Sequence, residues 1–178
     1  MNRKLEEILT SRFVVKEIVN NLDYLLEIIP ELKMTISFDQ KQHPNDLDLF
    51  WDILSRLSLS PNDYDIRLVI LLHDIAKPYY YQTEEVKDYK KYAKMSSIIS
   101  KNILTRLEYN DSYIEKICKM IEYYDTDLLD IDDLIFLRKI LIVQDCDVYS
   151  HNLQYLDKRV NCIAKLKKKI GEVNEKKE

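Results

Sequence analysis

The chain has 178 residues, a formal net charge of −4 and 46% hydrophobic residues, but only one Gly and four Pro. So few turn-forming residues exclude β-sandwiches and barrels, whose many hairpins need residues that accept positive φ, and favour an all-α fold. The negative charge argues against wholesale nucleic-acid binding, although the tail KLKKKIGEVNEKKE could form a local basic patch.

No targeting or membrane signal stands out. The segment MNRKLEEILTSRF is charged from its third residue, unlike a secretory signal, and no run approaches the roughly eighteen apolar residues of a membrane span. The three cysteines have neither disulfide-framework nor zinc-site spacing. We therefore expect a cytoplasmic protein that forms one domain over residues 1–178.

Hydrophobic periodicity predicts helices along nearly the whole chain. The N-terminal half favours one amphipathic helix over 3–20 and a second that stops near Pro30, because proline lacks the amide proton that a helix interior uses. An irregular stretch over 35–46 precedes a helix over about 46–59. Ser60, Pro61 and Asn62 then signal the start of a helix that continues to His73.

That helix is apolar nearly all round, which predicts a place at the centre of the domain. A polar, tyrosine-rich loop is expected after Lys77 and Pro78, to about Lys91. Further helices are predicted over 93–107, 112–124, 131–151 and 153–170, followed by a charged tail over 171–178. Asp111 or Ser112 is the expected N-cap of the helix over 112–124.

His73 and Asp74 end the most apolar predicted helix, where a charged pair is costly unless something compensates it. A divalent metal ion would do so, because imidazole nitrogen and carboxylate oxygen are suitable ligands. The alternative is a histidine that caps the helix C-terminus beside a solvated aspartate.

The segment VILLHDIAKP, which contains both residues, resembles the signature of the HD superfamily of metal-dependent phosphohydrolases. The stretches IIPEL, FDQKQHP, DLFWDIL and DVYSHN further resemble the HD portion of bacterial CCA-adding and poly(A)-polymerase-type nucleotidyltransferases. The resemblance covers residues from about 22 to 152 and implies a compact multi-helix HD-like bundle.

The same resemblance implies a metal site made of His73, Asp74, Asp147 and Asp52, the last standing where the family has its first histidine. Three carboxylates favour Mg²⁺ or Mn²⁺ over Zn²⁺ or iron. Helical spacing supports Asp147 over Asp145, because Asp147 follows Phe136, Ile140 and Val143 on one face. Asp145, on the face of Arg138, is expected to be solvated.

Other family positions differ. Two further histidines fall on Tyr92 and on Tyr123 or Tyr124, which are poor ligands when neutral, so at most one metal ion is expected. A loop histidine of the family falls on Asn45, with His43 as a displaced substitute. His151 could line the same cleft or lie at a helix end on the surface.

Tyrosines and lysines alternate over residues 79–94, where rings could stack on bases and ammonium groups could meet phosphates. Alternatively, the tyrosines pack a loop over the core. Trp51 is expected to be a core anchor.

The leading hypothesis is a phosphohydrolase that acts on a phosphate ester or nucleotide with one bound divalent ion. In it Asp74 and Lys77 take part in catalysis, with Lys77 stabilising charge that develops on the phosphate. The alternative is a degenerate HD domain that keeps the fold without turnover and serves as an RNA-binding or protein-interaction module. The sequence does not identify the substrate or the oligomeric state.

Overall fold

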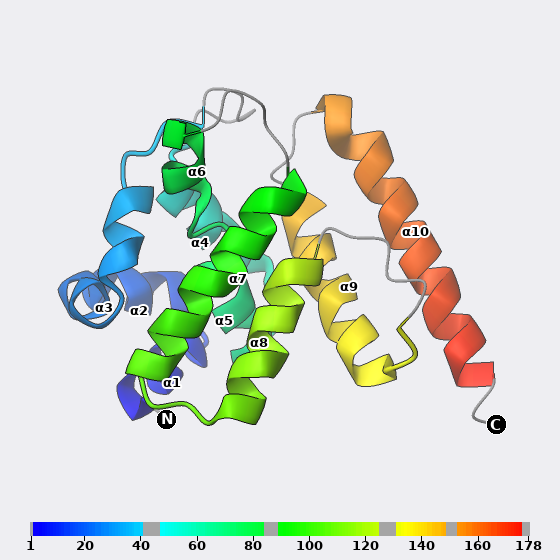
Figure 1. Ribbon diagram of the computed structural model, residues 1–178, viewed down its shortest axis with the longest axis horizontal. Coiled ribbons are helices and arrows are strands. Elements are labelled where there is room, and N and C mark those ends of the chain that lie inside the picture. The colour runs from blue at the N-terminus through cyan, green and yellow to red at the C-terminus, as the bar shows by residue number, and fades with distance from the viewer. Residues whose placement is uncertain (1, 41–46, 84–88, 125–130, 149–152, 176–178) are drawn as a thin grey trace.

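The computed structural model describes residues 2–40, 47–83, 89–124, 131–148 and 153–175, and these residues form helices with short connections (Figure 1). Within those ranges there is no β-strand, and extended pairing is limited to an isolated bridge between Asp39 and Asp48. The predicted all-α fold class is confirmed. The elements in chain order are α1 (Arg3–Leu9), α2 (Val14–Asn20), α3 (Leu22–Ile28), the 3₁₀ helix η1 (Pro30–Thr35), α4 (Leu49–Leu59), α5 (Tyr64–Leu72), α6 (Lys77–Thr83), α7 (Tyr89–Arg106), α8 (Asp111–Tyr123), α9 (Leu134–Val148) and α10 (Leu153–Glu175).

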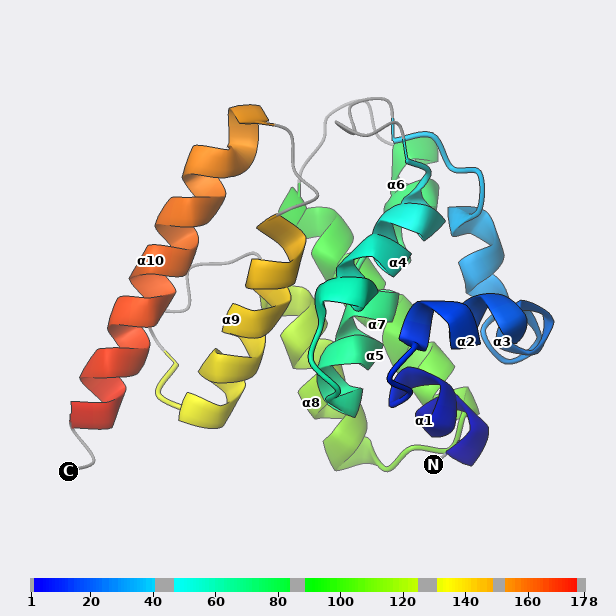
Figure 2. The same ribbon diagram turned by 180° about the vertical axis from the view of Figure 1, so that it is seen from behind.

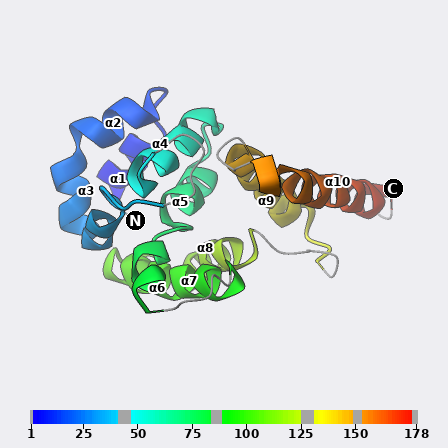
Figure 3. The same cartoon turned by 90° about the horizontal axis from the view of Figure 1, so that it is seen from above.

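The central element is α5, as its apolar sequence predicts. Every residue from Asp65 to Leu72 is buried, and the helix is surrounded by α1, α4, α8 and α9. Viewed from above, α1–α3 lie on one side of α5, α7 and α8 lie on another, and α9 leads outward to α10 (Figure 3). The C-terminal end of α5 therefore points into the space between α4, α8 and α9.

An aspartate fixes the start of α4. One carboxylate oxygen of Asp48 accepts a hydrogen bond from the Trp51 amide at 2.8 Å, and the other accepts one from the Ser37 amide, also at 2.8 Å. This N-cap satisfies amide groups that a helix start leaves without partners. Because Asp48 also holds the segment before it, α4 begins at Leu49 rather than near residue 46.

The predicted single helix over 3–20 is wrong, because the chain breaks between Leu9 and Val14. The buried Arg67 side chain on α5 stabilises this break. Its Nη1 donates to the carbonyl oxygens of Leu9 at 2.6 Å and Ser11 at 2.8 Å, and its Nε donates to Ser60 Oγ at 3.1 Å. Carbonyl oxygens at the end of α1 thus accept hydrogen bonds from a charged side chain instead of from the amides of a continuing helix.

Two further local predictions are wrong. Residues 77–83 form α6 instead of a loop, and Tyr80 turns its ring into the core with 5% of its surface exposed. The N-cap of α8 is Asn110, whose side chain accepts from the Tyr113 amide at 2.9 Å, instead of Asp111 or Ser112. Residues such as Asn and Asp are interchangeable as caps, so sequence alone leaves this position open by one or two residues.

The C-terminal helix α10 packs along α9 (Figure 2) and continues to Glu175, five residues past the predicted end at residue 170. Its buried residues Ile163, Leu166 and Val173 face α9, while Lys165, Lys167 and Lys168 are exposed. Part of the predicted charged tail is therefore helical. Among the described helices, none is both long and apolar enough to cross a bilayer.

Replacing Arg67 by Met should lower the free energy of unfolding by about 3 kcal/mol, because buried carbonyl oxygens would lose a charged donor. Urea titration followed by circular dichroism measures this change. Arg3→Met is the matched control, since the Arg3 side chain is 91% exposed and should tolerate the change within about 0.5 kcal/mol. Equal effects at the two positions would contradict the role given to Arg67.

Candidate functional site

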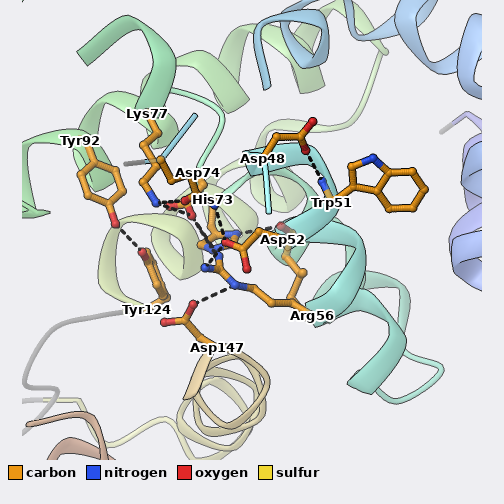
Figure 4. Close-up of polar contacts among 12 residues, drawn as sticks. Asp48, Trp51, Asp52, Arg56, His73, Asp74, Lys77, Tyr92, Tyr124 and Asp147 are labelled. Atoms are coloured by element: carbon orange, nitrogen blue, oxygen red, sulfur yellow. Dashed lines mark hydrogen bonds and ion pairs between the residues drawn. The ribbon is translucent and has the colours of Figure 1, made fainter. Parts of the chain in front are cut away.

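The structure brings together the four residues that the sequence singled out as metal ligands (Figure 4). Asp52 lies on the first turn of α4, His73 and Asp74 directly follow α5, and Asp147 lies near the end of α9. All four are buried, with at most 2% of each residue exposed. Residues far apart in sequence thus form one polar cluster inside an apolar core.

The centre of this cluster is filled by Arg56, a residue that the sequence analysis did not select. Its Nη2 lies 2.8 Å from Asp52 Oδ2, its Nη1 lies 3.0 Å from Asp74 Oδ2, and its Nε lies 3.1 Å from Asp147 Oδ1. The same Nη1 contacts His73 Nε2. One guanidinium therefore interacts with every predicted ligand.

These contacts fix the protonation state of His73. Arginine offers only donors, so the Nε2 that faces Arg56 must accept. Its Nδ1 then carries the proton and donates to the Ile70 carbonyl oxygen at 2.8 Å. Burial lowers the pKa of His73, and Arg56 lowers it further, although the neighbouring Asp74 raises it. The imidazole is therefore neutral at pH 7.

The carboxylates and Arg56 stabilise each other's charge. Burial alone would lower the pKa of Arg56, but Asp147, Asp52 and Asp74 outweigh burial and raise that pKa well above its ordinary value. Burial would raise the pKa of Asp74, yet the positive charges of Lys77 and Arg56 hold it well below its ordinary value. Arg56 and Asp74 are thus charged at any physiological pH.

Lys77 and Gln40 extend the cluster toward one side. Lys77 Nζ donates to Gln40 Oε1 at 2.6 Å and lies 3.7 Å from Asp74 Oδ2. Gln40 Nε2 in turn donates to Asp52 Oδ2 at 3.2 Å. Lys77, the residue expected to meet a phosphate, is thereby engaged with side chains of the chain itself, and 12% of its side chain is exposed.

Tyrosines stand where the resemblance implies two further histidines, and they divide between core and surface. Tyr92 and Tyr124 are buried and share a hydrogen bond between their hydroxyls at 3.0 Å, whereas Tyr123 is 37% exposed. The Tyr124 ring packs edge-on against His73, with ring centroids 4.9 Å apart. Burial and then Tyr124 raise the pKa of Tyr92, so its hydroxyl is neutral. Tyr124, not Tyr123, therefore belongs to the cluster.

The remaining predicted residues have mixed outcomes. The Asp145 side chain is 48% exposed, as expected, and lies 4.0 Å from Lys167. Trp51 is 51% exposed, so its prediction as a core anchor is wrong. Its ring lies on the outer side of α4 and points away from the cluster, while its amide donates to the N-cap residue Asp48 (Figure 4). His43, Asn45 and His151 lie outside the described residues.

With Arg56 in place, the cluster does not fit a metal ion. Mg²⁺ and Mn²⁺ need oxygen ligands at about 2.0–2.2 Å around one point. Here the carboxylate oxygens instead lie 2.8–3.1 Å from three different nitrogens of a planar group. In the part of the chain that the structure describes, no group of three or more His, Cys, Asp or Glu side chains has metal-binding geometry.

A sequence signal for Arg56 did exist. It lies four residues after Asp52 on the predicted helix, which places both side chains on one face. A charged residue on the buried face of an amphipathic helix requires a partner of opposite charge, and on the helix of Arg56 that partner is Asp52. That reasoning would have given the pair, but not the contacts with Asp74 and Asp147 from other helices.

Comparisons with family models, curated proteins and solved structures gave no match to this chain. The resemblance to the HD superfamily therefore stays a prediction from the motif.

The neutral state of His73 predicts a specific pH dependence. The unfolded chain takes up a proton on His73 near pH 6.5, while the folded chain does not, because the pKa of His73 is lowered in the fold. The unfolded state thus binds more protons, so stability falls as the pH drops. Between pH 7.5 and 5.5 the loss should reach up to about 1.4 kcal/mol.

Urea titrations at the two pH values measure this effect. The double variant His43→Gln/His151→Gln retains His73 as its one histidine and should keep the full dependence. His73→Gln should abolish most of it. A dependence that vanishes in the double variant and persists in His73→Gln would contradict the assignment.

Proposed function

We propose that this chain is an HD-like helical domain that works without turnover as a protein-interaction module. The observation that carries this proposal is the position of Arg56, whose guanidinium contacts Asp52, Asp74 and Asp147 at the centre of the cluster. Hydrolysis by a metal centre needs an ion with an open coordination position for water or substrate. In this arrangement a side chain of the protein satisfies the carboxylates instead.

The surroundings of the cluster support the same interpretation. His73 and Asp74 are each 1% exposed, and Lys77 is held by Gln40, so the groups that would meet a phosphate are turned toward each other. Buried ion pairs of this kind are typical of structural networks as well as of active sites. The cluster then serves to join α4, α5 and α9.

The exposed side chains favour a protein partner over RNA. Tyr80 and Tyr92, two rings of the tyrosine-rich segment, are buried and unavailable for stacking on bases. Trp51 and Leu59 are instead about half exposed, and both lie on the outer side of α4 with two exposed serines between them. Exposed aromatic and aliphatic side chains are enriched at protein interfaces, where tryptophan is a frequent hot spot.

A second candidate, the phosphohydrolase with one Mg²⁺ or Mn²⁺ ion, is favoured by one specific observation. Asp52, His73, Asp74 and Asp147 converge, as the motif predicts for a metal site. In that candidate Arg56 would have to leave the centre before an ion could bind, and the substrate would be a phosphate ester or nucleotide.

Purified protein supplied with Mn²⁺ or Mg²⁺ should hydrolyse generic phosphomonoesters and cyclic nucleotides no faster than the Asp74→Asn variant does. The reason is that Arg56 already occupies the space between the carboxylates. Phosphate release and nucleotide chromatography measure the rates. Metal-dependent hydrolysis by the wild type that Asp74→Asn reduces a hundredfold would favour the phosphohydrolase.

The interaction role predicts that Trp51→Glu removes binding partners without unfolding the chain, because the ring lies outside the core. Affinity capture with quantitative mass spectrometry compares this variant with the wild type. Ile98→Glu on α7 is the matched control, since Ile98 is 55% exposed but belongs to another helix. If both variants kept every partner while tRNA bound with steep salt dependence, the RNA-binding alternative would replace this proposal.

A further inference from the structure

We infer that Arg56 blocks a latent divalent-cation site, so that removing its guanidinium should convert this chain into a metal-binding protein. The inference extends the proposed function by giving the reason for the absence of turnover. It concerns metal binding by an Arg56 variant, however, and its failure would be distinct from a failure of the wild-type hydrolysis assay.

Two of the donors already have the spacing of neighbouring ligands. His73 Nε2 and Asp74 Oδ2 lie 3.4 Å apart and both contact Arg56 Nη1. Ligands at right angles around Mg²⁺, each about 2.1 Å from the ion, are about 3 Å apart. An ion at the position of Nη1 could therefore bind both residues after small movements of their side chains.

The other two donors surround the same guanidinium. Asp52 lies against Nη2 and Asp147 lies against Nε, so each carboxylate meets a different nitrogen of one planar group. Nitrogens of a guanidinium are about 2.3 Å apart, given partial double bonds of about 1.33 Å. The four donor side chains come from α4, the end of α5 and α9, and they enclose a space that holds one guanidinium group.

Charge favours a divalent cation once Arg56 is gone. The three carboxylates carry a formal charge of −3, Arg56 and Lys77 contribute +2, and neutral His73 adds nothing, which leaves −1. Without Arg56 the remainder is −2, which one divalent ion cancels. In addition, Asp74 Oδ1 is buried and has no hydrogen-bond partner among the described residues, so it is available to an ion.

In the wild type the guanidinium competes effectively with any ion. Arg56 is 4% exposed and forms three ion pairs, one of them with Asp52 on its own helix. To enter, an ion would have to lose hydrating water and also displace the Arg56 guanidinium from three buried ion pairs. Binding of Mn²⁺ to the wild type should therefore be weak.

The test compares Mn²⁺ binding to the wild type, Arg56→Ala and Arg56→Gln, with electron paramagnetic resonance to count free Mn²⁺. Both variants should bind one ion per chain at least a hundredfold more tightly than the wild type. Arg56→Lys is the matched control, because it retains a cation and should stay close to the wild type. Arg56→Ala/Asp147→Asn should lose at least tenfold in affinity relative to Arg56→Ala.

Thermal unfolding gives a second measurement, since a ligand that binds the folded state raises the melting temperature. Mn²⁺ should raise it for Arg56→Ala and leave the wild type unchanged. If Arg56→Ala is unfolded without metal, Mn²⁺ should restore its helical circular dichroism.

The inference is overturned if the wild type binds Mn²⁺ as tightly as the variants do. It is also overturned if Arg56→Gln is folded and shows no saturable binding, whatever the state of Arg56→Ala.

Discussion

Arg56 pairs with Asp52, Asp74 and Asp147 inside the core, and the arrangement of the central helices depends on these contacts. The carboxylates come from three places. Asp52 lies on the helix that carries Arg56, Asp74 lies at the end of α5, and Asp147 lies on the distant α9. Breaking a buried pair by removing one partner typically costs about 3–5 kcal/mol, because the other charge is left uncompensated. The guanidinium therefore selects the arrangement in which all three carboxylates reach it.

This constraint links the fold to the proposed role. Arg56 supplies an internal partner to the carboxylates, and the four predicted ligands, each at most 2% exposed, face the interior. The opposite face of α4 carries the half-exposed Trp51, which leaves the chain's largest side chain at the surface. One helix thus has a buried ionic face that fixes its position and an outer face, with Trp51, Leu59 and two serines exposed, for the proposed partner.

Much of this structure follows from the sequence. Low glycine and proline content predicts helices, and the all-round apolar character of residues 64–72 predicts the central position of α5. The resemblance to the HD superfamily selects Asp52, His73, Asp74 and Asp147, with helical spacing in favour of Asp147 over Asp145, and these four residues do converge. These inferences use composition, helical periodicity and a sequence resemblance, and tertiary contacts did not override them.

The rest depends on contacts between distant residues. The break after α1 is stabilised by Arg67, more than fifty residues later. The centre of the cluster is filled by Arg56, whose carboxylate partners lie on α4, directly after α5 and on α9. Periodicity places a side chain on a face but does not reveal what it meets across an interface. The exposure of Trp51 was not predicted either. Large apolar residues usually lie in cores, and the sequence does not show which neighbours such a residue meets.

The most direct test of the central claim is a crystal structure of the wild-type protein grown in millimolar MnCl₂, with anomalous diffraction data. We expect electron density for the Arg56 guanidinium between Asp52, Asp74 and Asp147, with no anomalous peak inside the cluster. A manganese peak within about 2.2 Å of those carboxylates, with Arg56 turned away, would contradict it.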